Sequence, residues 1–158
     1  MLFRSPLIVD LFEMILKKQC GIVVDDYCRE TERGRQWDRR KLAGTPVLQV
    51  LEREFQDFKY GNVYSVHLLV LLRGFSNDAA LLGCAEKLRG AEDGIRNLAA
   101  HEIVSVTDET IRQRTGMTSL QIMKEIKRAF SYTGIRITPE AWDSYDEMNQ
   151  VILERIAH

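Results

Sequence analysis

The stretch Val63–Phe75 reads VYSVHLLVLLRGF, and its apolar side chains would cover nearly every side of a helix. A helix that lacks a polar face is typical of a protein centre, where other elements surround it. We therefore expect Val63–Phe75 to form a central buried helix. His67 lies within it, and a single histidine on an apolar helix is more often a hydrogen-bonded core residue than a catalyst. We accordingly assign His67 to the core.

The rest of the sequence is divided by helix starts and stops. Proline and small polar residues are favoured at helix starts, and glycine just after helix ends. Starts are expected at Pro6, Pro46, Ser76–Asp78, Asp108, Ser119 and Pro139, and ends before Gly21, Gly61 and Gly116. Apolar residues recur at helical spacing between them. The sequence thus predicts an all-α fold, a bundle of about six or seven helices around Val63–Leu72.

Two segments fit this pattern less well. Ile22–Ala43 has weak apolar periodicity and many basic residues, so we expect it to be partly helical and partly exposed. Its basic run Arg29–Lys41 is able to meet RNA phosphates, but a solvated surface is the commoner role of such a run, and the sequence does not decide between them. Gly90 and Gly94 each weaken a helix, which predicts a bend or break there, with close backbone approach as the gain.

Residues 89–105 read RGAEDGIRNLAAHEIVS and hold the strongest candidate for chemistry. Asn97 and His101 are four residues apart, so they share a face of a helix, and a long Arg96 side chain can reach the same patch. Histidine moves protons near neutral pH, arginine holds a phosphate, and asparagine orients a hydroxyl or a phosphate oxygen. These groups suit phosphodiester cleavage without a metal. From residue types alone, a surface arginine with a histidine at a helix interface is an equally good reading.

The run RNLAAHE at Arg96–Glu102 resembles the catalytic motif of the HEPN superfamily, an arginine followed after four to six residues by a histidine. It is most similar to the HEPN ribonuclease domains of the CRISPR-associated Csm/Csx group, which accompany type III interference complexes. The resemblance extends over most of the chain through the expected helices at Ser119–Tyr132 and after Pro139. It implies a single HEPN-like domain at residues 1–158, acting as a homodimer in which two motifs meet.

The resemblance also implies a function. We expect a metal-independent endoribonuclease that cleaves single-stranded RNA by 2′-hydroxyl transesterification in antiviral defence, with Arg96, Asn97 and His101 as its catalytic set and no cofactor. Such enzymes carry a sensor domain for cyclic oligoadenylate. No alternating strand–helix pattern or Gly-rich phosphate loop is found here, so we expect either an isolated HEPN domain or a different regulation. The alternative is a catalytically silent helical module of the toxin–antitoxin or scaffold type.

Composition sets the remaining bounds. A chain of 158 residues with 45% hydrophobic content fits one globular domain. A net charge of −1 excludes a global basic field, so an RNA site has to be a local patch. Cys20, Cys28 and Cys84 lack metal-ligand spacing and indicate free thiols in a reducing compartment, with Cys20 and Cys84 buried. We find no transmembrane or signal segment and expect a cytoplasmic protein with no membrane association.

Overall fold

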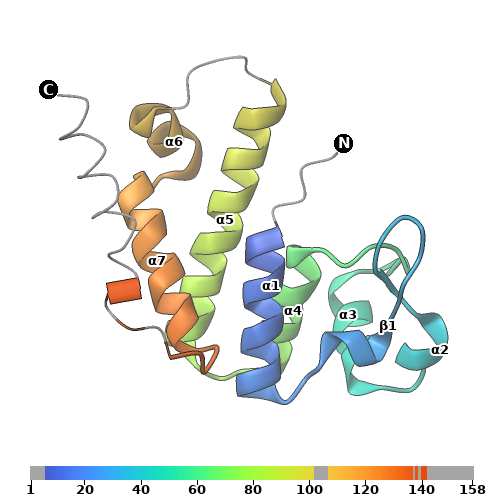
Figure 1. Cartoon of the computed structure of the whole chain (residues 1–158). Coiled ribbons are helices and arrows are strands. Elements are labelled where there is room, and N and C mark those ends of the chain that lie inside the picture. Colours follow the sequence, from blue (N-terminus) through green and yellow to red (C-terminus); the bar gives the residue numbers. More distant parts are fainter. Residues whose placement is uncertain (1–5, 102–106, 137, 139, 142–158) are drawn as a thin grey trace, which may run out of the picture.

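The computed structural model describes residues 6–101, 107–136, 138 and 140–141. This part of the chain holds seven α-helices, and Figure 1 shows α1, α4, α5 and α7 standing side by side, with α2, α3 and a small hairpin to one side. The α-helices are α1 Pro6–Ile15, α2 Arg39–Leu42, α3 Pro46–Glu54, α4 Ser65–Phe75, α5 Ala79–His101, α6 Asp108–Thr115 and α7 Ser119–Ser131. The predicted all-α fold is confirmed. The helix expected after Pro139, with Trp142 and Tyr145 facing inward, lies mostly outside the described residues.

Helix α4 is the centre of the bundle, as its composition predicts. Helices α1, α3 and α5 pack against it. Six of its eleven residues are buried: Ser65, Leu68, Leu69, Val70, Leu71 and Leu72. The first helix also follows the prediction, since α1 continues as a π-helical segment, η1 (Leu16–Cys20), and ends at Gly21 with a left-handed φ of 68°. Cys84 and Cys28 are buried, whereas Cys20 is only half-buried, which corrects one expectation.

The segment expected to be partly helical and partly exposed, Ile22–Ala43, also contributes to the core. It folds as a 3-10 turn, η2 (Val24–Tyr27), two antiparallel strands, β1 (Cys28–Arg29) and β2 (Gln36–Trp37), and the short helix α2. Trp37 and Leu42 are fully buried. Their spacing follows turns and strands, so a search for helical periodicity misses them. Most basic side chains of the run remain exposed, including Arg29, Arg39 and Arg40.

Helix α3 is shorter than predicted. Thr45 caps its first turn by accepting a hydrogen bond from the Leu48 N–H at 3.2 Å, as expected, but the helix ends at Glu54 and not near Gly61. Phe55 takes an extended backbone conformation, with φ −116° and ψ 102°. The chain then bends so that Phe55 and Phe58 both contact His67, with ring centroids 5.3 and 5.6 Å away. The helical spacing of these phenylalanines therefore reflects an aromatic cluster and not a longer helix.

Helix α5 runs unbroken from Ala79 to His101, so no helix break occurs at Gly90 or Gly94, contrary to one form of the prediction. Packing compensates for the weak helix propensity of these glycines. A side chain at Gly94 would lie 2.8 Å from the Arg114 carbonyl oxygen and 2.8 Å from Thr115 Cγ2, whereas nothing lies within 4 Å of Gly90. The expected close backbone approach is therefore confirmed at Gly94, where α6 packs against α5.

Helices α6 and α7 have the predicted bounds. Gly116 ends α6 with a φ of 73°, and the Thr118 side chain accepts from the Gln121 N–H at the start of α7. Ile126 and Phe130 of α7 pack against the core, but Leu120 and Met123 in its first two turns are exposed, at 64% and 45%. The apolar face of α7 is thus only partly covered by the described residues.

Candidate functional site

The last turns of α5 carry the candidate catalytic motif. Arg96, Asn97 and His101 all belong to this one helix, and the four-residue step places Asn97 and His101 on the same face. Figure 1 shows that this end of α5 extends beyond the ends of α1 and α4, with α6 beside it. The side chains of Asn97 and His101 lie outside the described part of the structure, so no contact is assigned to them.

The Arg96 guanidinium group is held by one ion pair and remains partly exposed. Its Nη2 donates to Glu92 Oε1 at 2.9 Å, one helical turn earlier. The side chain nevertheless remains 48% exposed. One carboxylate therefore orients the guanidinium group, and no second partner of this group is found among the described residues. A guanidinium group that is fixed in this way is well suited to hold a phosphate.

Glu92 is the buried anchor of this arrangement. Only 2% of its side chain is exposed, and Ser65 Oγ at the start of α4 donates to its Oε2. Arg89 Nη1 lies 3.8 Å from the same oxygen and also pairs with Asp93. Both carboxylate oxygens thus have partners, as a buried charge requires. Glu92 is thus a buried carboxylate in the middle of α5, bonded to both α4 and the motif arginine.

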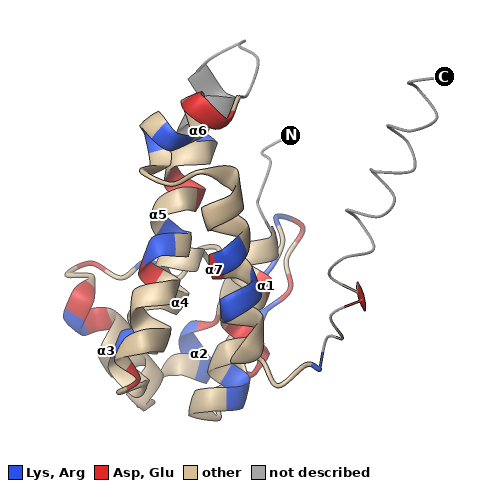
Figure 2. Ribbon diagram, turned by 90° about the vertical axis from the view of Figure 1, so that its left-hand side faces the viewer, with Lys and Arg blue, Asp and Glu red and all other residues tan. Residues whose placement is uncertain are grey.

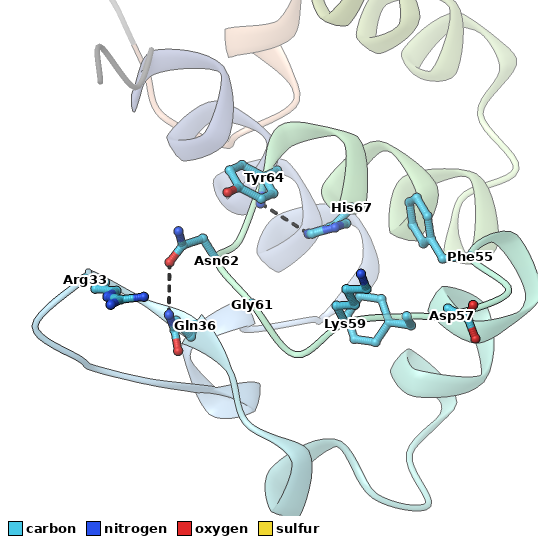
Figure 3. A pocket seen from close by; sticks show the side chains of 10 residues that line it. Arg33, Gln36, Phe55, Asp57, Lys59, Gly61, Asn62, Tyr64 and His67 are labelled. Atoms are coloured by element: carbon cyan, nitrogen blue, oxygen red, sulfur yellow. Dashed lines mark hydrogen bonds between the residues drawn. The ribbon is translucent and has the colours of Figure 1, made fainter. Parts of the chain in front are cut away.

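A pocket of about 410 Å³ opens on the hairpin side of the molecule (Figure 3). It is lined by Arg33, Gln36, Phe55, Asp57, Phe58, Lys59, Gly61, Asn62, Tyr64 and His67. These residues come from the β2 region, the α3–α4 connection and the first turn of α4. The pocket was not predicted from the sequence because its lining spans more than thirty positions and has no motif. The one local signal for it is the group of aromatic residues between Phe55 and Tyr64.

His67 is a partly buried, hydrogen-bonded residue that also forms part of the pocket wall. Its Nδ1 accepts hydrogen bonds from Trp37 Nε1 at 3.0 Å and from the Tyr64 N–H at 3.3 Å. Burial among aromatic rings lowers the pKa of His67 to about 4, because the charged form would lose its hydration. The ring is therefore neutral at physiological pH. With Nδ1 accepting two bonds, the proton resides on Nε2.

Charge is mixed over the surface, with basic and acidic residues interspersed along the helices (Figure 2). Among the residues that the structure describes, no three His, Cys, Asp or Glu side chains are grouped so that they could hold a metal ion. No helix within the same residues is long and apolar enough to cross a membrane.

Comparison with known proteins covers both regions. The family model described as the Cas_Csm6 HEPN domain matches residues 3–153, which include the motif and the pocket. A similar protein is the CRISPR system endoribonuclease Csm6 of Mycobacterium tuberculosis (strain ATCC 25618 / H37Rv), 32% identical over 121 residues. The match covers 75% of this chain and 27% of that protein, so the chain spans only about a quarter of its relative.

Proposed function

Because this chain belongs to the Cas_Csm6 HEPN domain family, we propose that it is an endoribonuclease that cleaves single-stranded RNA without a metal ion. The observation that carries the proposal is the RNLAAH motif at the end of α5, with Arg96 exposed and oriented by the buried Glu92. The name of the similar Csm6 endoribonuclease supports the same class of activity. The biological setting that we propose is type III CRISPR antiviral defence.

In the proposed reaction, the ribose 2′-oxygen attacks the neighbouring phosphorus atom and the bond to the 5′-oxygen breaks. The 2′-hydroxyl loses its proton to a base, and the leaving 5′-oxygen takes one from an acid. The products are a 2′,3′-cyclic phosphate and a 5′-hydroxyl. His101 carries protons, Arg96 holds the scissile phosphate and stabilises its growing negative charge, and Asn97 orients His101 or the ribose.

We further propose that the active form is a homodimer. A single Arg–Asn–His set offers only one proton-carrying group, and a twofold axis would supply a second. Ile95 precedes the motif and is 40% exposed, and Leu120 and Met123 of α7 are also exposed. Such apolar side chains are typical of an interface. Sedimentation at micromolar concentration is expected to show a dimer, and a monomer with full activity would contradict the composite site.

Residues 1–158 are proposed to act as one HEPN-like domain. Regulation by cyclic oligoadenylate is proposed to act through a sensor domain distinct from the HEPN-like domain.

The decisive experiment incubates fluorescent single-stranded RNA with the wild type and with His101→Ala, each with and without EDTA. The wild type is expected to cleave equally well in both conditions, whereas His101→Ala loses nearly all activity. The products of the wild type should resist phosphatase until the cyclic phosphate is opened by acid. Full activity of His101→Ala would reject the assigned role, and loss with EDTA would reject metal independence.

Arg96→Ala extends this test, with Arg53→Ala as its matched control. Both changes remove one exposed arginine, but Arg53 lies on α3 and pairs with its neighbour Glu54. Arg96→Ala is expected to lose cleavage while Arg53→Ala keeps it. Intact RNA with every variant and with the wild type would instead favour the catalytically silent helical module.

A further inference from the structure

The pocket of Figure 3 has walls of the kind that bind an unpaired nucleobase. Phe55, Phe58 and Tyr64 line it, and their rings surround His67 at centroid distances of 5.3 to 5.6 Å. Tyr64 is 45% exposed, so its ring is accessible to a ligand. Aromatic side chains stack on bases in single-stranded RNA, and every base offers a flat face for this contact. A volume of about 410 Å³ is in the range of small-ligand sites.

The polar groups of the pocket suit a neutral, hydrogen-bonding ligand. Gln36 Nε2 donates to Asn62 Oδ1 at 3.4 Å, a long bond that a better partner can replace. Among the described residues, His67 Nε2 has no hydrogen-bond partner, and it carries the proton because Nδ1 accepts from Trp37 and Tyr64. Two amides and one N–H donor can therefore meet the edge of a base.

The rim of the pocket adds charge for a phosphate. Two basic side chains, Arg33 and Lys59, and one acidic side chain, Asp57, line it. All three are exposed. The balance favours an anionic group beside the base, which is the chemistry of a nucleotide and not of a free base.

The pocket is also linked to the motif. Tyr64 is followed in the chain by Ser65, whose hydroxyl donates to Glu92, and Glu92 in turn accepts from Arg96. Two side-chain contacts thus connect the first turn of α4, which forms a pocket wall, to the arginine that we assign to the scissile phosphate. The pocket wall and the motif are therefore joined by a short series of contacts between α4 and α5.

We propose that this pocket binds one unpaired nucleotide of the single-stranded RNA substrate, away from the cleaved bond, with its base against Tyr64 and its phosphate near Lys59. The choice of RNA as occupant rests on the proposed function. The pocket then gives the enzyme a hold on its substrate that the motif alone lacks.

The test measures binding of a fluorescent ten-nucleotide RNA by anisotropy, with His101→Ala as the background so that the RNA stays intact. Tyr64→Ala is expected to raise Kd about tenfold, whereas Tyr64→Phe keeps the ring and stays within about twofold. Lys59→Ala is expected to raise Kd about threefold. Its matched control, Lys17→Ala, removes an exposed lysine outside the pocket and leaves Kd unchanged.

Abasic RNA identifies the base that occupies the pocket. One base is removed at a time along the oligonucleotide. At one position the loss should weaken binding about tenfold with Tyr64 present and not at all in Tyr64→Ala, because the stacking partner is already gone. Unchanged Kd values for Tyr64→Ala and Lys59→Ala, or abasic effects that are independent of Tyr64, would overturn the proposal.

The outcomes separate this proposal from the nuclease proposal. If Tyr64→Ala weakens RNA binding and no protein cleaves RNA, the pocket stands and the nuclease assignment fails. If the wild type cleaves RNA and Tyr64→Ala keeps its Kd and kcat/KM, the pocket assignment fails alone. If AMP binds in a Tyr64-dependent way and RNA does not displace it, the occupant is a free nucleotide and the proposal is wrong.

Discussion

The two halves of α5 have opposite environments although they form one continuous helix. In the first half, Leu81, Cys84, Ala85 and Leu88 are each about 1% exposed and face the core. In the second half, Ile95 is 40% exposed and the Arg96 side chain is 48% exposed. Glu92 lies at the boundary and is the last buried charged residue before the motif. The buried first half fixes the helix in the bundle, and the exposed second half carries the motif residues.

The strongest test of this contrast compares two truncations on α5. Leu88→Ala removes a fully buried side chain and is expected to lower the free energy of unfolding by about 3 kcal/mol. Ile95→Ala removes an exposed one and is expected to change it by less than about 1 kcal/mol. Urea unfolding measures both. Equal losses would contradict the contrast, and a loss for Ile95→Ala that grows with protein concentration would place Ile95 in a subunit interface.

A pH titration of stability examines the buried part next. Burial holds the pKa of His67 at about 4, below its ordinary value of 6.5. As the pH falls, His67 therefore takes up a proton in the unfolded chain before it does so in the folded protein. The stability that neutral His67 contributes is fully present above pH 6.5 and is lost as the pH falls toward 4. The loss is expected to reach at most about 3 kcal/mol. Urea unfolding of His67→Gln across the same range should show a shallower slope, and an unchanged slope would exclude His67 as the cause.

Two glycines one turn apart on α5 should respond in opposite directions. Gly94→Ala places a methyl group against the α6 backbone and is expected to destabilise the protein by about 2 kcal/mol. Gly90→Ala meets no atom within 4 Å and is expected to stabilise it by up to about 1 kcal/mol, through better helix propensity. Thermal unfolding of both variants measures the difference. Two effects of the same sign would argue against the contact between α5 and α6.

The boundary residue Glu92 links the two halves. Glu92→Gln keeps the size of the side chain but weakens its hold on Arg96, so kcat for RNA cleavage is expected to fall about tenfold with KM little changed. Asp93→Asn is the matched control, because Asp93 is 53% exposed and pairs with Arg89 and not with Arg96. An equal effect of both changes would remove the positioning role from Glu92.

The smallest expected effect concerns the N-terminal cap of α7, the helix that packs beside α5. Thr118 caps α7 through the Gln121 N–H at 3.2 Å. Thr118→Ala is expected to lower stability by about 1 kcal/mol and to leave RNA cleavage by the wild-type motif intact. Circular dichroism during heating checks the first part, and the cleavage assay checks the second.

Much of the fold could be predicted because the signals are local. The starts of α1, α3 and α7, the bounds of α6 and the burial of α4 follow from caps, glycines and apolar composition within a few residues. The motif on α5 was found in the same way, from residue types within one turn and a half. The predicted role of His67 as a hydrogen-bonded core residue is confirmed by its bonds to Trp37 and Tyr64.

Local sequence signals are therefore enough to predict most of the helices and to place Arg96, Asn97 and His101 along one of them. Tertiary contacts explain why α5 passes Gly94 without a break, why Glu92 is buried against Ser65, and why Trp37 and Phe55 meet around His67. The physical reason is range. Helix signals act between residues three or four positions apart, whereas these contacts join residues 12 to 30 positions apart and form only when the bundle closes.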